Sequence, residues 1–289
     1  MSFEIIIQAT INGLLIGCIY ALSALGLTLI WGTMEIINFA HGSFLMLGMY
    51  VSFWIFTLLE IDPLFSLPIV FILFFLFGIL FYKCLLKSVI FQKTWFSQIL
   101  LTYGLGIFLV GFALYFWSPN YKLVQGNVLQ GAPLILLGVH IGFSEFYVSV
   151  ISLLCMAALF FFLNRTKMGR AIKATSINKE AASLVGINIE YIFTLVLGLG
   201  IALVGVTGAL LSNFYYIFPE IGGVFGTLAF VVVAIGGFGS IQGAVYGGIL
   251  LGLVTSLSGI LIGSPFKYAI AYSLYLIVMY FKPKGLKGW

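Results

Sequence analysis

Long stretches without a charged side chain constrain this chain more than any other feature of its sequence. Charged residues make up only 7% of it, whereas soluble domains average about 25%. Because so few charges cannot cover a surface that faces water, we predict an integral membrane protein. Charge-free intervals occupy residues 5–34, 36–59, 63–82, 94–121, 123–144, 146–164, 191–219 and 221–266.

These intervals are predicted to be helices that cross the bilayer. A helix needs about 20 apolar residues to span about 30 Å of hydrocarbon, and the interval 221–266 is long enough for two spans. A membrane β-barrel would show short alternating segments in place of continuous apolar runs. The predicted fold is an all-α, polytopic membrane protein with eight or nine transmembrane helices, some broken at glycine-rich segments. It forms a single transmembrane domain over residues 1–289.

Basic residues indicate which loops face the cytoplasm. They gather at Lys83, Lys87 and Lys93, in the segment 165–190, and in the C-terminal tail. Counting spans from these loops puts the N-terminus outside. It also makes residues 118–143 an extracytoplasmic loop, whose sequence favours a small hairpin over a span. Since the basic residues lie beside the spans, the net charge of +5 indicates orientation and not nucleic-acid binding.

The sequence predicts neither a catalytic site, a metal site nor a bound cofactor. The eight acidic residues are spread along the chain, and the two histidines, His41 and His140, are predicted on opposite sides of the membrane. No nucleophile with a base and no pair of carboxylates stands out. The three cysteines lack metal-ligand spacing, so we expect them to pack as small apolar residues. The opening MSFEIII has no basic region, so we expect it to be retained and not cleaved as a signal peptide.

Small residues recur four positions apart, which predicts helices that pack closely in lipid. The pairs are Gly13 and Gly17, Gly222 and Gly226, Gly239 and Gly243, Gly243 and Gly247, Gly248 and Gly252, and Gly259 and Gly263.

Two glycine-rich segments interrupt the apolar runs, one in each half of the chain. The first is GTMEIINFAHG, residues 32–42, and the second is AIGGFGSIQG, residues 234–243. Paired interrupted segments point to the translocation path of a transporter, because broken backbone at membrane depth needs protein or water to satisfy its polar groups. The predicted path residues are Asn12, Asn38, His41, Gly42, Gly236, Gly237 and Gly239.

Two interpretations of the first segment stay open. Asn38 and His41 either face a polar cavity or helix break, or lie in a cytoplasmic turn in which Asn38 caps the next helix. Glu35 is expected near the inner interface, which favours a turn at that residue.

The long basic loop contains the signals of a short helix. Asn178 is a suitable N-cap, residues 179–185 follow as the helix, and Gly186 ends it. A short helix lying across the inner face is a good docking element for a cytoplasmic partner. The alternative is an ordinary positively charged loop that only sets topology.

The residues of this loop favour the first alternative. Glu180, Ala181 and Ala182, followed after three residues by Gly186, resemble the EAA---G signature of ABC importer permeases. The chain also resembles branched-chain amino acid permeases of the Liv type over nearly its whole length, most specifically in INFAHG and GGFGSIQGAVYGG. By length and N-terminus it is similar to the first of their two permease subunits. The similar stretches are residues 12–32, 37–50, 169–188 and 229–254.

The resemblance implies a complex in the bacterial cytoplasmic (inner) membrane. Two cytoplasmic ABC ATPase subunits, a second permease subunit and an extracytoplasmic substrate-binding protein would import Leu, Ile or Val. ATP would be hydrolysed by the partners, and this sequence contains no P-loop motif. The residues expected to couple ATPase movement to transport are Arg170, Glu180, Ala181, Ala182 and Gly186.

Two alternatives to this function remain. Similar permeases transport urea, short amides or other amino acids. A channel or secondary carrier would need no ATPase, so the EAA-like helix would be dispensable. The near absence of charge within the spans argues against a proton-coupled carrier, which usually has a buried acid or histidine relay.

Overall fold

Helices dominate the computed structural model, which describes residues 3–90, 95–136 and 139–287. Within these ranges, seven helices are long and apolar enough to cross a membrane, and α10, Ile221–Gly236, is apolar but shorter. The prediction of an all-α, polytopic protein is confirmed, and the count of eight or nine spans stays a prediction. The seven long helices are α1 Phe3–Met34, α2 His41–Leu59, α3 Pro63–Phe81, α5 Trp95–Trp117, α6 Phe143–Arg165, α9 Ile189–Leu211 and α11 Ile241–Leu261.

Shorter elements complete the chain. A π-helical turn, Tyr82–Leu86, follows α3 and leads into α4, Lys87–Ile90. The helix therefore continues beyond the charge-free interval 63–82. Two helices, α7 Lys167–Ile177 and α8 Lys179–Leu184, form the predicted cytoplasmic loop, and α12 Lys267–Phe281 follows α11.

The centre of the bundle is formed by α1 and α9. The most apolar stretch of each is 83% buried, against 22% for α5. Glycine allows this close packing: a Cβ on Gly13 or Gly17 would lie 2.9 Å from a backbone Cα of α11, where no side chain fits. The predicted small-residue packing is therefore confirmed at these positions. Gly259 and Gly263 pack on no helix backbone of the described chain, since a Cβ there meets only side-chain atoms, no closer than 3.8 Å; packing of this pair against a partner subunit stays a prediction.

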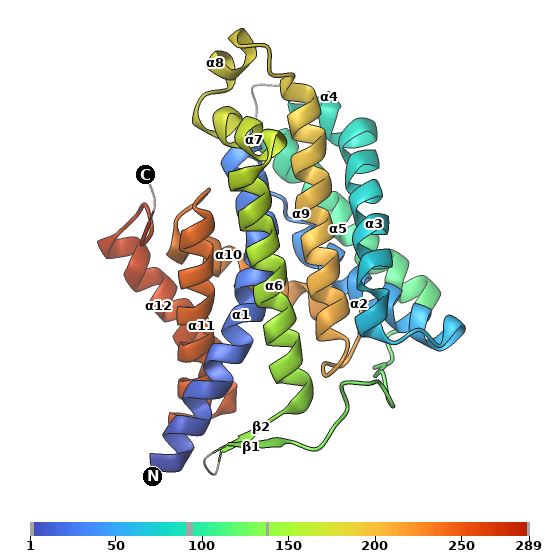
Figure 1. The fold of residues 1–289 in the computed structure, drawn as a ribbon, viewed down its shortest axis with the longest axis vertical. Helices are drawn as coiled ribbons and strands as arrows, with labels where there is room; N and C mark the ends of the chain where they lie inside the picture. Colours follow the sequence, from blue (N-terminus) through green and yellow to red (C-terminus); the bar gives the residue numbers. More distant parts are fainter. Residues whose placement is uncertain (1–2, 91–94, 137–138, 288–289) are drawn as a thin grey trace.

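The two ends of the bundle differ in what they carry. α4, α7 and α8 lie at one end, the upper one in Figure 1, and the N-terminus lies at the other. Lys87 therefore lies at the same end as the 165–190 loop, as the basic pattern predicts, while Lys93 is outside the described residues. Which end faces the cytoplasm follows from the basic residues and stays a prediction.

The hairpin expected within residues 118–143 is present at the end that holds the N-terminus (Figure 1). Strand β1, Leu134–Leu136, pairs antiparallel with β2, Val139–Ile141, and residues 137 and 138 are outside the described part. The Gln8 side chain accepts a hydrogen bond from the backbone N–H of His140 at 2.8 Å. This bond joins the hairpin to the beginning of α1.

Candidate functional site

The first interrupted segment turns back into the bundle. α1 ends at Met34, and residues 35–40 run without helical structure until α2 begins at His41. The His41 Nε2 atom lies 2.9 Å from the backbone oxygen of Ser23, about three helical turns before the end of α1. Because the carbonyl oxygen accepts, Nε2 donates this bond. α2 therefore begins deep within the length of α1, and not at its end.

Protein groups satisfy part of the exposed backbone at this break. The Asn38 Oδ1 atom accepts a hydrogen bond from Ala40 N at 3.2 Å, and the Thr102 hydroxyl of α5 donates to the Ile37 carbonyl at 3.1 Å. Asn38 and His41 are both fully buried. This geometry matches the predicted helix break, whereas the alternative of Asn38 as helix cap is wrong: Ala40 occupies the N-cap position of α2, without a side-chain cap.

Two buried nitrogen atoms at the break lack a partner among the described residues. They are Nδ2 of Asn38 and Nδ1 of His41. A buried polar group without a hydrogen bond costs about 1–3 kcal/mol of stability. Such a cost requires an explanation, and a polar solute passing this point is one.

α2 and α10 cross where each begins. A Cβ on Gly42 would collide with the Gly222 carbonyl, a Cβ on Gly222 with the Gly42 carbonyl, and a Cβ on Gly226 would lie 2.9 Å from the Gly42 Cα. The two backbones touch because all three positions are glycine. α10, expected to span from about residue 225, starts beside the beginning of α2, so both positive helix ends lie at one depth.

An open cavity of about 660 Å³ lies against this crossing. α5 forms one wall, with Tyr103 and Gly106, and Ser43 of α2 and Glu220 also line it. The Ser43 hydroxyl donates to the Gly106 carbonyl at 3.2 Å, which joins α2 to α5. Of the predicted path residues, Gly42 lines this cavity, whereas Asn38 and His41 are fully buried and are not among its lining residues.

The second interrupted segment lies elsewhere. Gly237 and Gly239 adopt left-handed φ values of 104° and 78° in the turn between α10 and α11. This turn packs on the end of α1, where the rings of Phe238 and Trp31 are 5.0 Å apart. The C-terminal tail covers it: the backbone N–H of Lys287 donates to the Gly236 carbonyl at 3.0 Å.

The predicted path residues therefore fall into three places. Asn38, His41 and Gly42 share the α2 break, whereas Gly236, Gly237 and Gly239 lie in the α10–α11 turn at the end of α1. Asn12 lines a separate cavity near the opposite end of the bundle. This separation could not be predicted, because glycine-rich interruptions look alike in a sequence whether they occur at mid-depth or at a helix end.

The short helix predicted in the basic loop is present as α8. The Asn178 side chain accepts a hydrogen bond from Ala181 N at 2.9 Å and caps α8, and Gly186 ends the helix at a φ of 85°. Arg170, Glu180 and Ala181 are exposed, while Ala182 packs inward.

Two further residues of this loop were not predicted. Leu184 is 88% exposed and Val185 is 77% exposed. The two apolar side chains are thus adjacent and exposed at the end of α8. The signal in the sequence was the pair LV between charged and polar residues.

The loop directly contacts the break between α1 and α2. The Lys179 ammonium of α8 lies 3.2 Å from the Glu35 carboxylate. A cavity of about 260 Å³ is lined by Ser176 and Ile177 of the loop together with Trp31, Glu35 and Phe238. The loop therefore lies over the place where both interrupted segments meet the end of α1.

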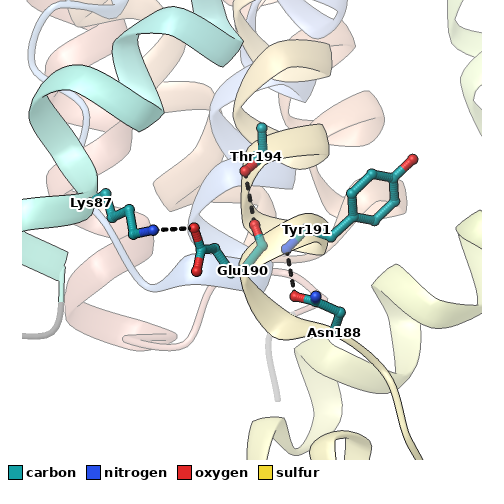
Figure 2. A network of polar contacts seen from close by, with 5 residues as sticks. All are labelled: Lys87, Asn188, Glu190, Tyr191 and Thr194. Carbon is teal, nitrogen blue, oxygen red and sulfur yellow. Dashed lines mark hydrogen bonds and ion pairs between the residues drawn. The ribbon is translucent and has the colours of Figure 1, made fainter.

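The other end of the loop is held by polar contacts at the start of α9 (Figure 2). Asn188 caps α9 by accepting from Tyr191 N at 3.0 Å, and Thr194 donates to the Glu190 carbonyl at 2.8 Å. The Glu190 carboxylate forms an ion pair with Lys87 of α4 at 2.5 Å. The end of the loop thus caps α9, and Glu190 ties α9 to α4.

Residues 9–281 match the protein family described as the permease component of branched-chain amino acid transport systems. The chain belongs to this family. The match extends from the beginning of α1 to the end of α12, so it includes the break, the crossing and the loop. The resemblance found in the sequence is confirmed.

Named relatives agree with this family over most of their length. The permease protein BraD of Pseudomonas aeruginosa, from a high-affinity branched-chain amino acid transport system, is 32% identical over 98% of this chain and 95% of its own. LivH of Escherichia coli K12 is 31% identical over 99% and 97%. LivH of Methanocaldococcus jannaschii, a probable permease of the same kind, is 29% identical over 92% and 88%. This chain is therefore a multi-pass membrane protein of the permease family.

Proposed function

We propose that this chain is a membrane-spanning subunit of an ATP-driven importer of branched-chain amino acids. The observation that carries the proposal is the match to this permease family over residues 9–281. It works in the bacterial inner membrane with a second permease subunit, two cytoplasmic ABC ATPase subunits and an extracytoplasmic binding protein. The ATPase subunits hydrolyse ATP, and this chain moves in response.

The substrate path passes the crossing of α2 and α10. A zwitterionic amino acid needs polar contacts for its charges and apolar contacts for its side chain. Two positive helix ends meet at Gly42 and Gly222 and suit a carboxylate without a fixed charge. The neighbouring cavity supplies apolar walls, including Phe39 and Phe230. Weak, uncharged contacts of this kind let a solute leave as readily as it enters.

Coupling begins at α8. Movement of a docked ATPase displaces Leu184 and Val185 with the helix that carries them. Lys179 transfers this displacement to Glu35 at the start of the break, and the wall formed by Ser176 and Ile177 transfers it to Phe238. Both interrupted segments therefore shift together, which opens or closes the path between α2 and α10.

The proposal is tested by co-purifying the tagged chain from its native membrane and reconstituting the complex. ATP hydrolysis and uptake of labelled leucine are measured with and without the binding protein. We expect ATPase subunits to co-purify and both rates to rise with loaded binding protein. Leucine uptake that persists without ATPase subunits would favour a channel or secondary carrier.

The substrate range is tested in the same vesicles. Uptake of leucine, isoleucine and valine is compared with uptake of urea and short amides at equal concentration. Faster uptake of urea or amides would mean that the chain belongs to an importer with a different substrate.

A further inference from the structure

A second cavity, of about 440 Å³, opens near the end of the bundle that holds the N-terminus. It lies between α1, α6, the α9–α10 connection, and the region from the end of α11 to the start of α12. Its polar lining includes Asn12, Tyr20, Glu145, Tyr215 and Lys267. This cavity is separate from the one beside the α2–α10 crossing, with which it shares no lining residue.

The cavity carries one acid and one base that do not pair. Glu145 lies in the first turn of α6, and Lys267 is the first residue of α12. Neither forms an ion pair within 4.0 Å with any residue that the structure describes. The Lys267 ammonium lies 4.8 Å from the centre of the Tyr268 ring, and no residue that the structure describes accepts a hydrogen bond from it. Both side chains are half-buried, where an unpaired charge is costly.

The remaining lining divides into neutral polar groups and an apolar wall. Burial raises the pKa of the Tyr215 phenol, and Tyr268 and Glu145 nearby add to the effect, so the phenol stays protonated and able to donate. Ile16, Ile19 and Phe214 provide the apolar wall. Opposite charges, a neutral donor and an aliphatic wall within one cavity match the parts of an amino acid with a branched side chain.

We propose that this cavity is a receiving site for a free α-amino acid zwitterion, with its ammonium group at Glu145 and its carboxylate at Lys267. The proposal rests on the proposed function, since that function supplies an amino acid at this end. The bound zwitterion pairs both charges at once and places its aliphatic side chain against Ile16 and Ile19. The site lies at the end opposite α7 and α8 (Figure 1), where a binding protein would release its load.

The first test measures protection of a thiol in the cavity. Gly259 lines it, and a Cβ there meets nothing closer than the Lys267 Cβ at 3.9 Å, so Gly259→Cys fits. The variant is made with Cys18, Cys84 and Cys155 replaced by alanine, in the full complex in nanodiscs. We expect leucine at ten times its half-protecting concentration to slow modification by a small thiol reagent about tenfold.

Leucine analogues separate the two charges. Isoamylamine lacks the carboxylate, and 4-methylpentanoate lacks the ammonium group. We expect each to protect about tenfold less well than leucine, because each leaves one charge of the cavity unpaired. Equal protection by all three compounds would overturn the proposal, since it would leave no role for the charges.

Two variants assign the charges. Glu145→Gln should raise the half-protecting concentration of leucine about tenfold and leave that of 4-methylpentanoate unchanged. Lys267→Gln should raise the half-protecting concentration of leucine to the same extent and leave that of isoamylamine unchanged. Glu60→Gln, an exposed acid outside the cavity, is the matched control and should not alter protection. Co-purification of the ATPase subunits checks that each variant folds.

The outcomes separate this proposal from the proposed function. If the unmodified complex imports leucine but leucine never protects the thiol, the receiving site is wrong and the importer stands. If no leucine enters and none protects, both fail. If protection instead follows the phosphatidylethanolamine content of the nanodisc and ignores leucine, the cavity holds a lipid headgroup and the receiving site is again wrong.

Discussion

At the scale of single residues, the break between α1 and α2 contains residues that lower the stability of the fold. Contacts within the chain do not offset this loss of stability. Glu35 takes a left-handed φ of 59° without being glycine, and His41 is fully buried with Nδ1 unpaired. Such features concentrate where a protein binds or moves something. Two predictions follow from these two residues.

Replacing Glu35 by glutamine should lower coupling more than stability. The substitution removes the ion pair with Lys179. The Glu35 side chain of this pair is 64% exposed, and exposed ion pairs contribute only about 0–1 kcal/mol to stability. We therefore expect an almost unchanged melting temperature, continued ATP hydrolysis and reduced leucine uptake per ATP. Glu190→Gln is the matched control because it removes the other exposed ion pair, with Lys87, away from the break. Equal effects of both substitutions would contradict a specific role for Glu35.

Replacing His41 by leucine should impair transport without destabilising the protein. The change removes one hydrogen bond to Ser23 but also one unpaired buried nitrogen, and removal of both is close to neutral for stability. We expect leucine uptake to fall by at least about tenfold, or about 1.4 kcal/mol in the barrier, at a similar melting temperature. His41→Gln keeps an N–H donor and should retain more activity. Normal leucine uptake by the His41→Leu variant would show that His41 serves only in packing.

At the scale of helices, glycine decides which faces touch, and the short exposed helix α8 is the proposed docking element for a partner. α2 and α10 meet through backbone atoms at Gly42, Gly222 and Gly226. α8 instead projects at the end of the bundle, with its apolar tip exposed (Figure 1). The first contact lies within the chain and the second is proposed to bind another subunit, so substitutions in them should have different consequences.

Neighbouring glycines of α10 should respond in opposite ways to alanine. A Cβ on Gly222 would collide with the Gly42 carbonyl, whereas a Cβ on Gly223 meets nothing within 4 Å. Gly222→Ala should therefore destabilise by about 1–3 kcal/mol through overpacking. Gly223→Ala should be neutral or stabilise by up to about 1 kcal/mol, because alanine favours a helix over glycine. Thermal unfolding of the two purified variants measures this difference, and equal melting temperatures would mean that the helices do not cross here.

Substitutions at the tip of α8 should release the ATPase subunits. Leu184→Asp places a charge on the most exposed apolar side chain of the loop, which should reduce co-purification while the chain stays folded. Gly186→Pro should do the same, because a φ of 85° is closed to proline. Ser183→Ala, also exposed on α8, is the control and should retain the ATPase subunits. Full co-purification with all three variants would show that docking occurs elsewhere.

At the scale of the whole molecule, the bundle has two unlike ends joined by two buried helices. α1 and α9 run through its centre. One end holds α7 and α8 over the end of α1, and the other holds the hairpin and the charged cavity of Glu145 and Lys267. α1 connects the two ends, since its residues line the cavities at both of them.

The orientation of this bundle can be measured with single cysteines. In a background without native cysteine, Val185→Cys should react with an impermeant thiol reagent only from the cytoplasmic side. Tyr121→Cys, at an exposed position of the 118–143 loop, should react only from outside. The physical reason is that basic residues stay on the cytoplasmic side during insertion. Labelling of intact and opened spheroplasts distinguishes the two sides, and reversed labelling would invert the topology.

Local signals in the sequence determined the class of protein, most of its helices and the short helix of its basic loop. A long charge-free run specifies a membrane helix wherever it folds. Asn178 and Gly186 act on backbone groups a few residues away, so α8 was predicted with an error of one residue at its end. The hairpin in the 118–143 loop followed from turn chemistry in the same way.

Only the tertiary structure decided how deep the break lies and which residues share a cavity. His41 reaches Ser23, Gly42 meets Gly222, and Glu145 lines one wall with Lys267. Each of these relations joins segments far apart in sequence, and uniformly apolar helices carry no periodic pattern to show which face turns inward. Close packing of small residues fixed those faces, and with them the positions of the few polar groups.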